Sequence, residues 1–338
     1  MKKLRFAVIG TGFWARYQIP AWLELEGVQL VALYNRTLHK ADLLADQYGI
    51  PRTYDDIDEL LENEELDFVD IITDVDTHYQ FTRKAAEKGI PVICQKPMAA
   101  TLEQAIQMQT FCREREVPLF IHENFRWQAP IRALKAAIDS GLIGKVFKGR
   151  VSFCSAFPVF ENQPFLAELD HFILTDIGSH ILDVCRFLFG EATNLFALTQ
   201  RVNPTIKGED VANVLMEMEK GVLCFAEMSY ASMLEKESFP ETHVLVEGEK
   251  GSLLLTHNFE LSITTKDGTR SETIDPPKYD WVDPDYAVVH ASIVDCNRDI
   301  LNGLRGGNAE TTGADNLKTV RLVWDAYKSM TKREVIHY

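Results

Sequence analysis

The N-terminal stretch carries the pattern that most limits how this chain can fold. Residues Leu4 to Ile9 are apolar enough for a buried strand, and Gly10-Thr11-Gly12-Phe13-Trp14-Ala15 follows at once and opens a helical segment that reaches Leu23. In such a unit the first glycine allows a tight turn, the second lets backbone N–H groups approach a pyrophosphate, and a small third residue keeps helix and strand close. A plain βα turn is the alternative, but the context favours dinucleotide binding. The residues expected at the cofactor are Gly10, Thr11, Gly12, Phe13 and Trp14.

Strand and helix patterns alternate through the first third of the chain. Strands are expected at 28–34, from 53, at 68–72 and at 118–121, and a further apolar run begins at Pro91 and ends in Gln95-Lys96-Pro97. Helical segments separate these strands. This alternation is typical of a parallel sheet with helices on both faces, that is, a doubly wound Rossmann domain.

After residue 124 the rhythm changes. A helix at 130–140 is followed by alternating strands without crossover helices, at 146–155, 195–202, 211–218, 222–231, 242–247, 251–256 and 260–265. Such a run predicts a large, mostly antiparallel open sheet in an α+β domain. Helices are expected at 174–189, 288–304 and 315–330. A chain of 338 residues is too long for one ordinary core. We therefore predict a dinucleotide-binding domain at 1–124 and a substrate-binding and oligomerisation domain at 125–338.

The charge, the apolar runs and the cysteines of the chain exclude several classes of partner and location. The formal net charge of -15, with no basic cluster, argues against nucleic acid and anionic membranes. The apolar run before Gly10 is too short for a signal peptide, and no other run approaches the ~18 residues of a membrane span. The six cysteines are scattered without Cys-x-x-Cys spacing. These features predict a cytoplasmic protein without a disulfide framework or a structural zinc site.

The end of the second strand bears on the choice of cofactor. Asn35-Arg36-Thr37 stands where an acidic residue normally binds the adenosine ribose. Asn35 can hydrogen-bond a 2′-hydroxyl and does not repel a 2′-phosphate. Arg36, helped by His39 or Lys40, can pair with that phosphate or stack on adenine. NAD and NADP both remain open on these residues.

Two sets of polar residues are candidates for chemistry. Pro97 favours an extended backbone at Lys96, which places this lysine at a strand end, either as a solvated charge or as a catalytic group where open α/β sheets bind ligands. In the segment at 174–189, Asp176, His180 and Asp183 have the i, i+4, i+7 spacing of one helix face. A structural histidine and a zinc ligand pair are the alternatives for His180. No Glu-x-x-His companion lies nearby, so no metal site is predicted.

Four ordered motifs resemble the Gfo/Idh/MocA oxidoreductases. They are the glycine motif at 10–15, Gln95-Lys96-Pro97, Glu123-Asn124-Phe125-Arg126-Trp127 and Asp176-Ile177-Gly178-Ser179-His180-Ile181-Leu182-Asp183. The similarity continues through 246–253 and so covers nearly the whole chain. It implies hydride transfer between a nicotinamide, NAD or NADP, and a hydroxyl-bearing carbon of a sugar or cyclitol.

The resemblance also implies residue roles. Lys96 would orient or polarise the reacting oxygen, His180 would be the general acid/base, and Asp176 would bind substrate hydroxyls and the lysine. These types suit the chemistry, because histidine titrates near pH 6.5 and a cationic lysine stabilises an alkoxide. Further cofactor contacts are expected from Thr73, His78, Gln95, Lys96 and Arg126. Further substrate contacts are expected from Arg126, Trp127, Phe153, Phe157 and Asp183, although each aromatic could equally belong to the core.

Two departures from the family pattern stand out. The family usually has Glu before Lys-Pro, where this chain has Gln95. The loop after the fourth strand commonly reads Thr-Pro-Asn-x-x-His, whereas Asp74 and Val75 stand between Thr73 and the later His78. Cofactor contacts in this loop are therefore expected mainly from the backbone.

The resemblance implies an NAD(P)-dependent sugar or polyol dehydrogenase that converts an aldose to a lactone. It favours NAD over NADP, because catabolic sugar oxidation usually uses NAD. Within the family, the glycine loop and residues 33–37 look most like pentose-type sugar dehydrogenases. The alternatives are an NAD-dependent glycosidase of the same fold and a non-catalytic nucleotide-sensing module. A homodimer or homotetramer is expected, because one face of the antiparallel sheet would lack helices.

Overall fold

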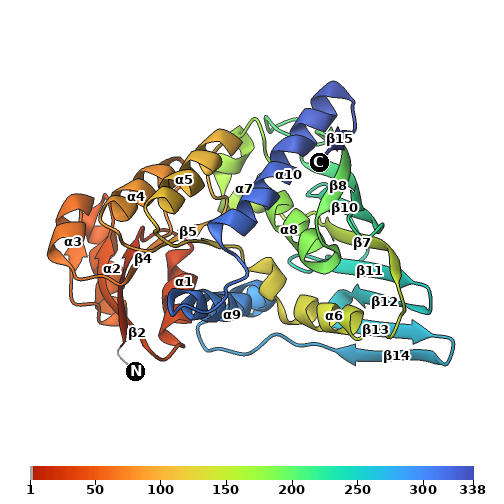
Figure 1. Ribbon diagram of the computed structural model, residues 1–338, viewed down its shortest axis with the longest axis horizontal. Coiled ribbons are helices and arrows are strands. Elements are labelled where there is room, and N and C mark those ends of the chain that lie inside the picture. The colour runs from red at the N-terminus through yellow and green to blue at the C-terminus, as the bar shows by residue number, and fades with distance from the viewer. Residues whose placement is uncertain (1–2) are drawn as a thin grey trace. The chain divides into compact units, whose positions relative to one another are not determined.

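The computed structural model describes residues 3–338, so Met1 and Lys2 of the predicted 1–124 domain lie outside the described residues. The chain divides into two compact units (Figure 1). Unit 1 comprises the chain up to Asn124 together with Tyr279–Asp283 and Ile293–Val320. Unit 2 comprises Phe125–Lys278, Pro284–Ser292 and Arg321–Tyr338. The domain prediction from sequence places the two late segments of unit 1 in the second domain instead.

Unit 1 contains a six-stranded sheet whose paired strands all run parallel. Its strands are β1 (Leu4–Ile9), β2 (Val28–Tyr34), β3 (Thr53–Tyr54), β4 (Phe68–Ile71), β5 (Val92–Gln95) and β6 (Leu119–His122). Their order is β3-β2-β1-β4-β5-β6, so the chain reverses direction across the sheet between β1 and β4. Ligands of doubly wound sheets bind at this switch point, beyond the carboxyl ends of the strands. The predicted Rossmann fold is confirmed.

Helices follow the strands of unit 1 as the alternation predicted. They are α1 (Ala15–Leu23), α2 (Leu38–Tyr48), α3 (Ile57–Asn63), α4 (Val75–Glu87) and α5 (Leu102–Glu114). Asp56 caps α3 by accepting hydrogen bonds from two backbone N–H groups, and Thr101 caps α5 by accepting one. Helix α4 begins at Val75, and Asp74 occupies its N-cap position.

Apolar contacts explain why late residues belong to unit 1. Ile293 and Val294 pack against Ala21 of α1 in a buried cluster. The indole Nε1–H of Trp281 donates to Glu24 Oε1 at 3.0 Å. These contacts join residues more than 250 positions apart in the chain, which local patterns in the sequence do not reveal.

Unit 2 contains a nine-stranded, mostly antiparallel sheet, as predicted. Its order is β14-β13-β12-β11-β7-β10-β9-β8-β15, and only the pair β7 and β10 is parallel among the described pairings. The strands are β7 (Val146–Cys154), β8 (Ala192–Gln200), β9 (Val211–Met218), β10 (Leu223–Ser229), β11 (His243–Gly248), β12 (Gly251–Thr256), β13 (Glu260–Thr265), β14 (Gly268–Thr273) and β15 (Ile336–His337). Strands β14 and β15 were not predicted, because β14 is exposed throughout and β15 has two residues.

The helical elements of unit 2 include η1 (Phe125–Trp127), α6 (Ala129–Asp139), α7 (Val159–Asn162), η2 (Pro164–Glu168), α8 (Ile177–Phe189), η3 (His257–Phe259) and η4 (Pro284–Tyr286). Helices α9 (Ala287–Leu304) and α10 (Gly313–Lys332) contribute residues to both units. Helix α8 packs on β7 and β10 and covers one face of the sheet. Among the described residues, no helix is both long and apolar enough to span a membrane.

Candidate functional site

The glycine turn after β1 is built as a backbone cradle. Gly10 has φ +107°, and a Cβ there would lie 2.7 Å from the carbonyl oxygen of Ile72, so glycine is required by the protein itself. Gly12 differs, because a Cβ there would meet nothing within 4 Å. The packing of the chain thus leaves open space beside Gly12. Such space suits the close approach of a pyrophosphate to the backbone, which is the role predicted for this glycine.

Asn35 at the end of β2 is tied to the glycine turn. Its Nδ2 donates to Thr11 Oγ1 at 2.6 Å, and its Oδ1 accepts from the backbone N–H of Thr37 at 2.8 Å. Both hydrogen bonds hold the side chain beside the glycine turn, at the end of β2. Arg36 beside it is exposed.

Gln95 belongs to a buried chain of hydrogen bonds that begins at the backbone of Lys96. The Lys96 N–H donates to Gln95 Oε1, and Gln95 Nε2 donates to Gln18 Oε1, each at 2.8 Å. Gln18 Nε2 then donates to both carboxylate oxygens of Asp70, at 2.9 and 2.8 Å, and Trp22 Nε1 donates to Asp70 Oδ2 at 2.7 Å. We call these residues the Gln95 relay.

The direction of the relay is set at one end. A backbone N–H can only donate, so Gln95 must accept there and donate at its other end, and Gln18 must do the same. Residue 70 must therefore be an acceptor, which explains a carboxylate inside an apolar strand. Burial raises the pKa of Asp70 to about 7, while the hydrogen bonds from Trp22 and Gln18 oppose that shift. Gln95 thus anchors the Lys96 backbone through a neutral side chain.

We expect Gln95→Glu to lower the free energy of unfolding by about 1–3 kcal/mol at pH 8, because the introduced carboxylate and Asp70 would both present oxygens to Gln18. Adding Asp70→Asn should recover most of the loss, since a flipped Gln18 can then donate to residue 95 and accept from residue 70. Urea unfolding measures both effects. Gln47→Glu, on the exposed surface of α2, is the matched control and should change little.

The pH dependence gives a second readout of the relay. Because the folded pKa of Asp70 is raised, the folded chain binds a proton that the unfolded chain has lost between about pH 4 and pH 7. This group's contribution to stability is full below that window and is lost as pH rises through it. Asp70→Asn should remove that slope. If the losses in unfolding free energy of Gln95→Glu and Asp70→Asn were simply additive in the double variant, the Gln95 relay would be contradicted.

His78 braces the loop ends next to the switch point. Its ring nitrogens lie 3.0 Å from the carbonyl oxygens of Pro97 and Thr73, and the side chain is buried. Burial lowers its pKa. Thr73 Oγ1 also accepts from Thr77 at 2.7 Å. The His78 ring and the Thr73 hydroxyl are thus engaged within the protein. Their predicted role at the cofactor is compatible with holding the loop backbone in place rather than with direct side-chain contact.

In unit 2, His180 and Asp176 lie one turn apart at the start of α8. Asp176 occupies the N-cap position, and the helix begins at Ile177, three residues later than predicted. The His180 ring is buried and stacks on Phe125 of η1 with centroids 3.8 Å apart. The Tyr230 hydroxyl donates to Asp176 Oδ2 at 3.5 Å. Burial, followed by the Asp176 carboxylate, raises the pKa of Tyr230, so it stays a donor.

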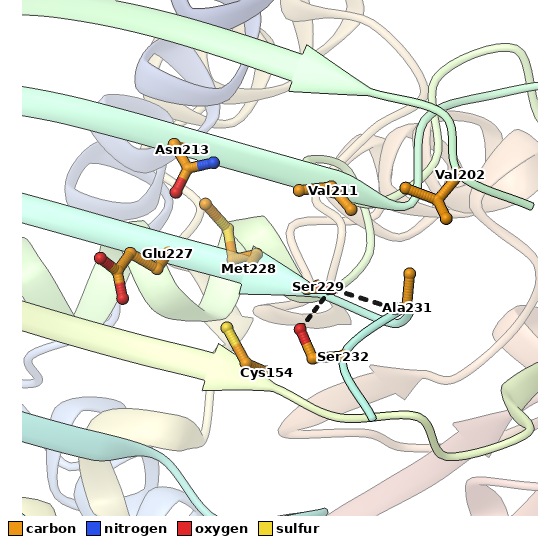
Figure 2. Close-up of a pocket in the computed structure, with 9 residues that line it drawn as sticks. All are labelled: Cys154, Val202, Val211, Asn213, Glu227, Met228, Ser229, Ala231 and Ser232. Carbon is orange, nitrogen blue, oxygen red and sulfur yellow. Dashed lines mark hydrogen bonds between the residues drawn. The ribbon is translucent and has the colours of Figure 1, made fainter. Parts of the chain in front are cut away.

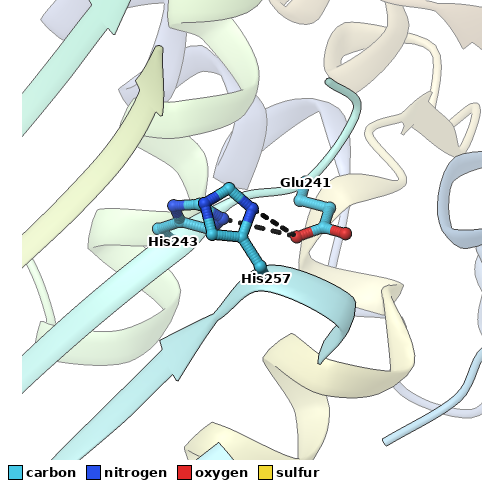
Figure 3. Close-up of side chains that lie close together, drawn as sticks. All are labelled: Glu241, His243 and His257. Atoms are coloured by element: carbon cyan, nitrogen blue, oxygen red, sulfur yellow. Dashed lines mark hydrogen bonds and ion pairs between the residues drawn. The ribbon is translucent and has the colours of Figure 1, made fainter. Parts of the chain in front are cut away.

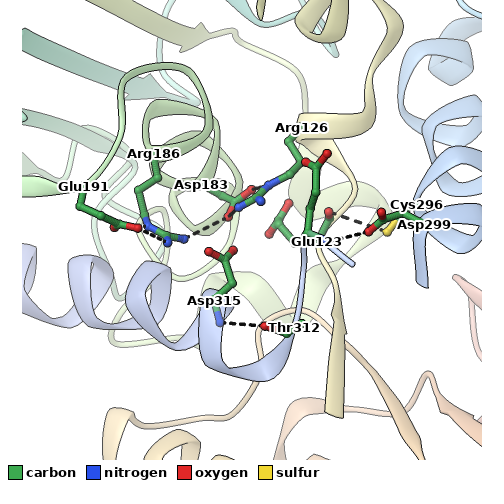
Figure 4. Close-up of polar contacts among 10 residues, drawn as sticks. Glu123, Arg126, Asp183, Arg186, Glu191, Cys296, Asp299, Thr312 and Asp315 are labelled. Carbon is green, nitrogen blue, oxygen red and sulfur yellow. Dashed lines mark hydrogen bonds and ion pairs between the residues drawn. The ribbon is translucent and has the colours of Figure 1, made fainter. Parts of the chain in front are cut away.

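Asp183 lies on the same side of α8 as His180, and its carboxylate is paired with arginine side chains. Arg126 donates to its two oxygens from Nε at 2.7 Å and from a terminal nitrogen at 2.6 Å (Figure 4). Arg186 lies 3.7 Å from the same carboxylate and makes two 2.9 Å hydrogen bonds to Glu191. Asp183 and Arg126 are both buried. This pair fixes η1 against α8 and so supports the Phe125 ring under His180.

The aromatic candidates divide by burial. Phe153 is 1% exposed and packs near Tyr230 and Phe239, as a core residue does. Phe157 is half-buried and stacks on Phe239 at 3.9 Å. The Arg132 guanidinium lies over the Trp127 ring, with its Cζ 4.2 Å from the ring centroid. The buried Nε1–H of Trp127 has no hydrogen-bond partner among the described residues.

The sequence patterns do not predict four residues that support the candidate site: Gln18, Asp70, Phe125 and Tyr230. A carboxylate within the apolar run 68–72 was a usable signal for Asp70. The other three have ordinary core or surface patterns. Lys96 belongs to unit 1, whereas Asp176, His180 and Arg126 belong to unit 2.

Comparisons with known proteins agree with these features. A family model described as the oxidoreductase family with an NAD-binding Rossmann fold matches residues 4–123, and the GFO/IDH/MocA C-terminal domain matches 131–254. D-apiose dehydrogenase of Paraburkholderia graminis is 44% identical over 97% of this chain and 88% of its own length. The enzyme of the same name from Rhizobium rhizogenes is 41% identical over 97% of this chain and 96% of its own.

A solved structure extends this similarity to three dimensions. It is an oxidoreductase from Agrobacterium radiobacter in complex with NAD+, L-tartaric acid and magnesium, with a TM-score of 0.97 and 40% identity. The match covers 99% of this chain and 98% of that one. The switch-point cradle, the His180 helix and these full-length relatives lead to one conclusion: the chain belongs to the Gfo/Idh/MocA family of oxidoreductases, with an NAD-binding Rossmann domain.

Proposed function

We propose that this chain is an NAD-dependent dehydrogenase of D-apiose or a closely similar aldose, and that its first product is a lactone. The observation that carries the proposal is the full-length similarity, above 40% identity, to two D-apiose dehydrogenases. The NAD+ in the Agrobacterium radiobacter structure supports the cofactor. The space beside Gly12 suits the same group.

In this proposal, Lys96, Asp176 and His180 act on one substrate hydroxyl. His180, held in orientation by the Phe125 ring, accepts the hydroxyl proton. The Lys96 ammonium stabilises the alkoxide as it forms, and the Gln95 relay fixes the backbone from which it extends. Asp176 accepts hydrogen bonds from sugar hydroxyls. Bound NAD+ supplies the hydride acceptor.

Arg126 and Asp183 take a supporting part in the proposed site. Their mutual hydrogen bonds occupy both carboxylate oxygens, so we assign them to positioning η1 and α8. Trp127 is the better candidate for substrate contact, because its buried indole N–H lacks a partner among the described residues. Phe157, which is half-buried, can line the pocket, whereas Phe153 serves the core.

The test is a panel of aldoses and polyols with NAD and with NADP, followed by the absorbance of the reduced nicotinamide. We expect D-apiose with NAD to give the highest kcat/KM, and hydroxylamine trapping to detect the lactone. Absence of turnover with every sugar would overturn the proposal. Retained NAD with glycoside cleavage and no net reduction would identify the glycosidase, and sugar-independent nucleotide binding would identify a sensor.

We also propose a cytoplasmic location and a homodimer or homotetramer. All six cysteines are free thiols, which suits a reducing compartment. On the sheet face opposite α8, Leu198, Leu215, Leu223 and Leu254 are each more than 40% exposed. A pocket of about 300 Å³ on this sheet is lined by nine residues, among them Cys154, Asn213 and Glu227 (Figure 2). A monomeric mass in light scattering at micromolar concentration would contradict the assembly.

A further inference from the structure

Three potential metal ligands converge in unit 2 at the open end of a hairpin. One ligand atom from each of Glu241, His243 and His257 lies within 4.8 Å of the others (Figure 3). None of the three belongs to the site described above. The sequence did not suggest them, because His257 stands 14 positions after His243 and no spacing motif joins them.

Strand pairing explains why these residues meet. Strands β11 and β12 are antiparallel, with Val244 opposite Leu255 and the connecting turn after Gly248. The start of β11 therefore lies beside the end of β12. His243 and Glu241 approach from the first strand and the residues just before it, and His257 approaches from the residue that follows the second.

The separations suit a tetrahedral ion. His243 Nε2 lies 3.3 Å from Glu241 Oε2, and His257 Nδ1 lies 3.8 Å from the same oxygen. Two ligands bound at the usual Zn–N and Zn–O lengths of about 2.0–2.1 Å lie about 3.3 Å apart in a tetrahedron. The two imidazole rings are nearly perpendicular, at 78°, with centroids 4.4 Å apart. Small side-chain rotations would direct all three atoms to one point.

The carboxylate is also held from behind. The backbone N–H of Asn258 donates to both oxygens of Glu241, at 3.1 and 3.2 Å. Asn258 has φ +58°, a left-handed conformation that asparagine adopts more readily than most residues. Hydrogen bonds of this kind orient metal ligands and tune their affinity. The ligand side chains are 17–31% exposed, so an ion can enter from solvent.

The ligand set selects the type of ion. Two imidazoles and one carboxylate suit Zn²⁺, with water in the fourth position, whereas Mg²⁺ requires oxygen ligands. We propose that Glu241, His243 and His257 form a Zn²⁺ site that cross-links the open end of the β11–β12 hairpin. Binding requires the neutral His243 tautomer that carries its proton on Nδ1, so that the Nε2 lone pair faces the ion and replaces the hydrogen bond to Glu241.

The experiment uses the full chain without a histidine tag, stripped with a chelator and then titrated with Zn²⁺, Co²⁺ or Mg²⁺. We expect one Zn²⁺ per chain by equilibrium dialysis, a Zn²⁺-dependent rise in melting temperature and the visible spectrum of tetrahedral Co²⁺. Mg²⁺ should neither bind at one ion per chain nor raise the melting temperature. Glu241→Gln, His243→Asn and His257→Asn should each weaken Zn²⁺ binding by more than about tenfold.

The control is His337→Asn, an exposed histidine on β15 at the far edge of the same sheet, which should bind Zn²⁺ normally. Melting temperatures in chelator show whether each variant is folded. If a single variant fails to fold, the wild-type Co²⁺ spectrum still decides whether the ion is tetrahedral, and the other two variants still test the ligands. Equal Zn²⁺ retention by the wild type and by a variant that carries all three substitutions, or octahedral Co²⁺, would overturn the proposal.

Discussion

Lys96→Met is expected to lower kcat for sugar oxidation by about 10²–10³-fold while leaving the chain folded. The substitution keeps an unbranched side chain but removes the cation that stabilises the developing alkoxide, and such electrostatic contributions have this size. The hydrogen bond from the residue 96 backbone to Gln95 is unaffected. Initial rates with NAD and the best sugar from the panel measure the loss, and equal melting temperatures establish that folding is intact.

His180→Asn should lower kcat by about 10²–10⁴-fold, because the amide cannot transfer the proton. The pH–rate profile should lose its acidic limb in this variant, which a merely structural role of His180 would not predict. Lys88→Met, an exposed lysine after α4, is the control and should leave the rate unchanged. Unchanged sugar-dependent reduction in both active-site variants would refute the proposed mechanism.

Asp183→Ala is expected to reduce the free energy of unfolding of unit 2 by about 3–5 kcal/mol. It would leave the buried Arg126 guanidinium without its two short hydrogen bonds and remove the carboxylate that Arg186 also faces. Removing one partner of a buried ion pair has this cost, because the remaining charge stays desolvated. Urea unfolding followed by tryptophan fluorescence measures the change.

Asp139→Ala is the matched control for that experiment. Asp139 is also paired, with Lys135 one helical turn away, but its side chain is 60% exposed. Exposed pairs of this type contribute about 0.3–0.5 kcal/mol. A loss at Asp183 no larger than at Asp139 would show that the Arg126 pair does not fix η1 to α8. Loss of activity without loss of stability would instead place Asp183 in contact with substrate.

Local patterns were sufficient for most elements of both sheets. Strand β1 and the turn at Gly10 have a composition that allows few other structures, and the alternation in β9 and β10 predicts strands directly. Boundaries failed where local signals were weak. Helix α8 was expected from residue 174 because Leu174 continues the apolar pattern, yet the helix starts only after Asp176.

Long-range packing accounts for what the sequence left open. The sequence raised the question of Gln95 without answering it, since Gln18 and Asp70 lie 77 and 25 positions away. Only folding brings the three together. The same holds for Arg126 with Asp183 and for the hairpin histidines.

The glycine motif, the Lys-Pro strand end and the His180 helix were readable in the sequence because each depends on neighbours within one or two turns of chain. The distant partners of the buried polar groups were decided by tertiary structure alone. Hydrogen-bond direction, burial and carboxylate charge depend on residues that become neighbours only when strands and helices pack. For that reason the sequence by itself determined the family and its cofactor domain, and the structure decided what holds Gln95, Asp183 and Glu241 in place.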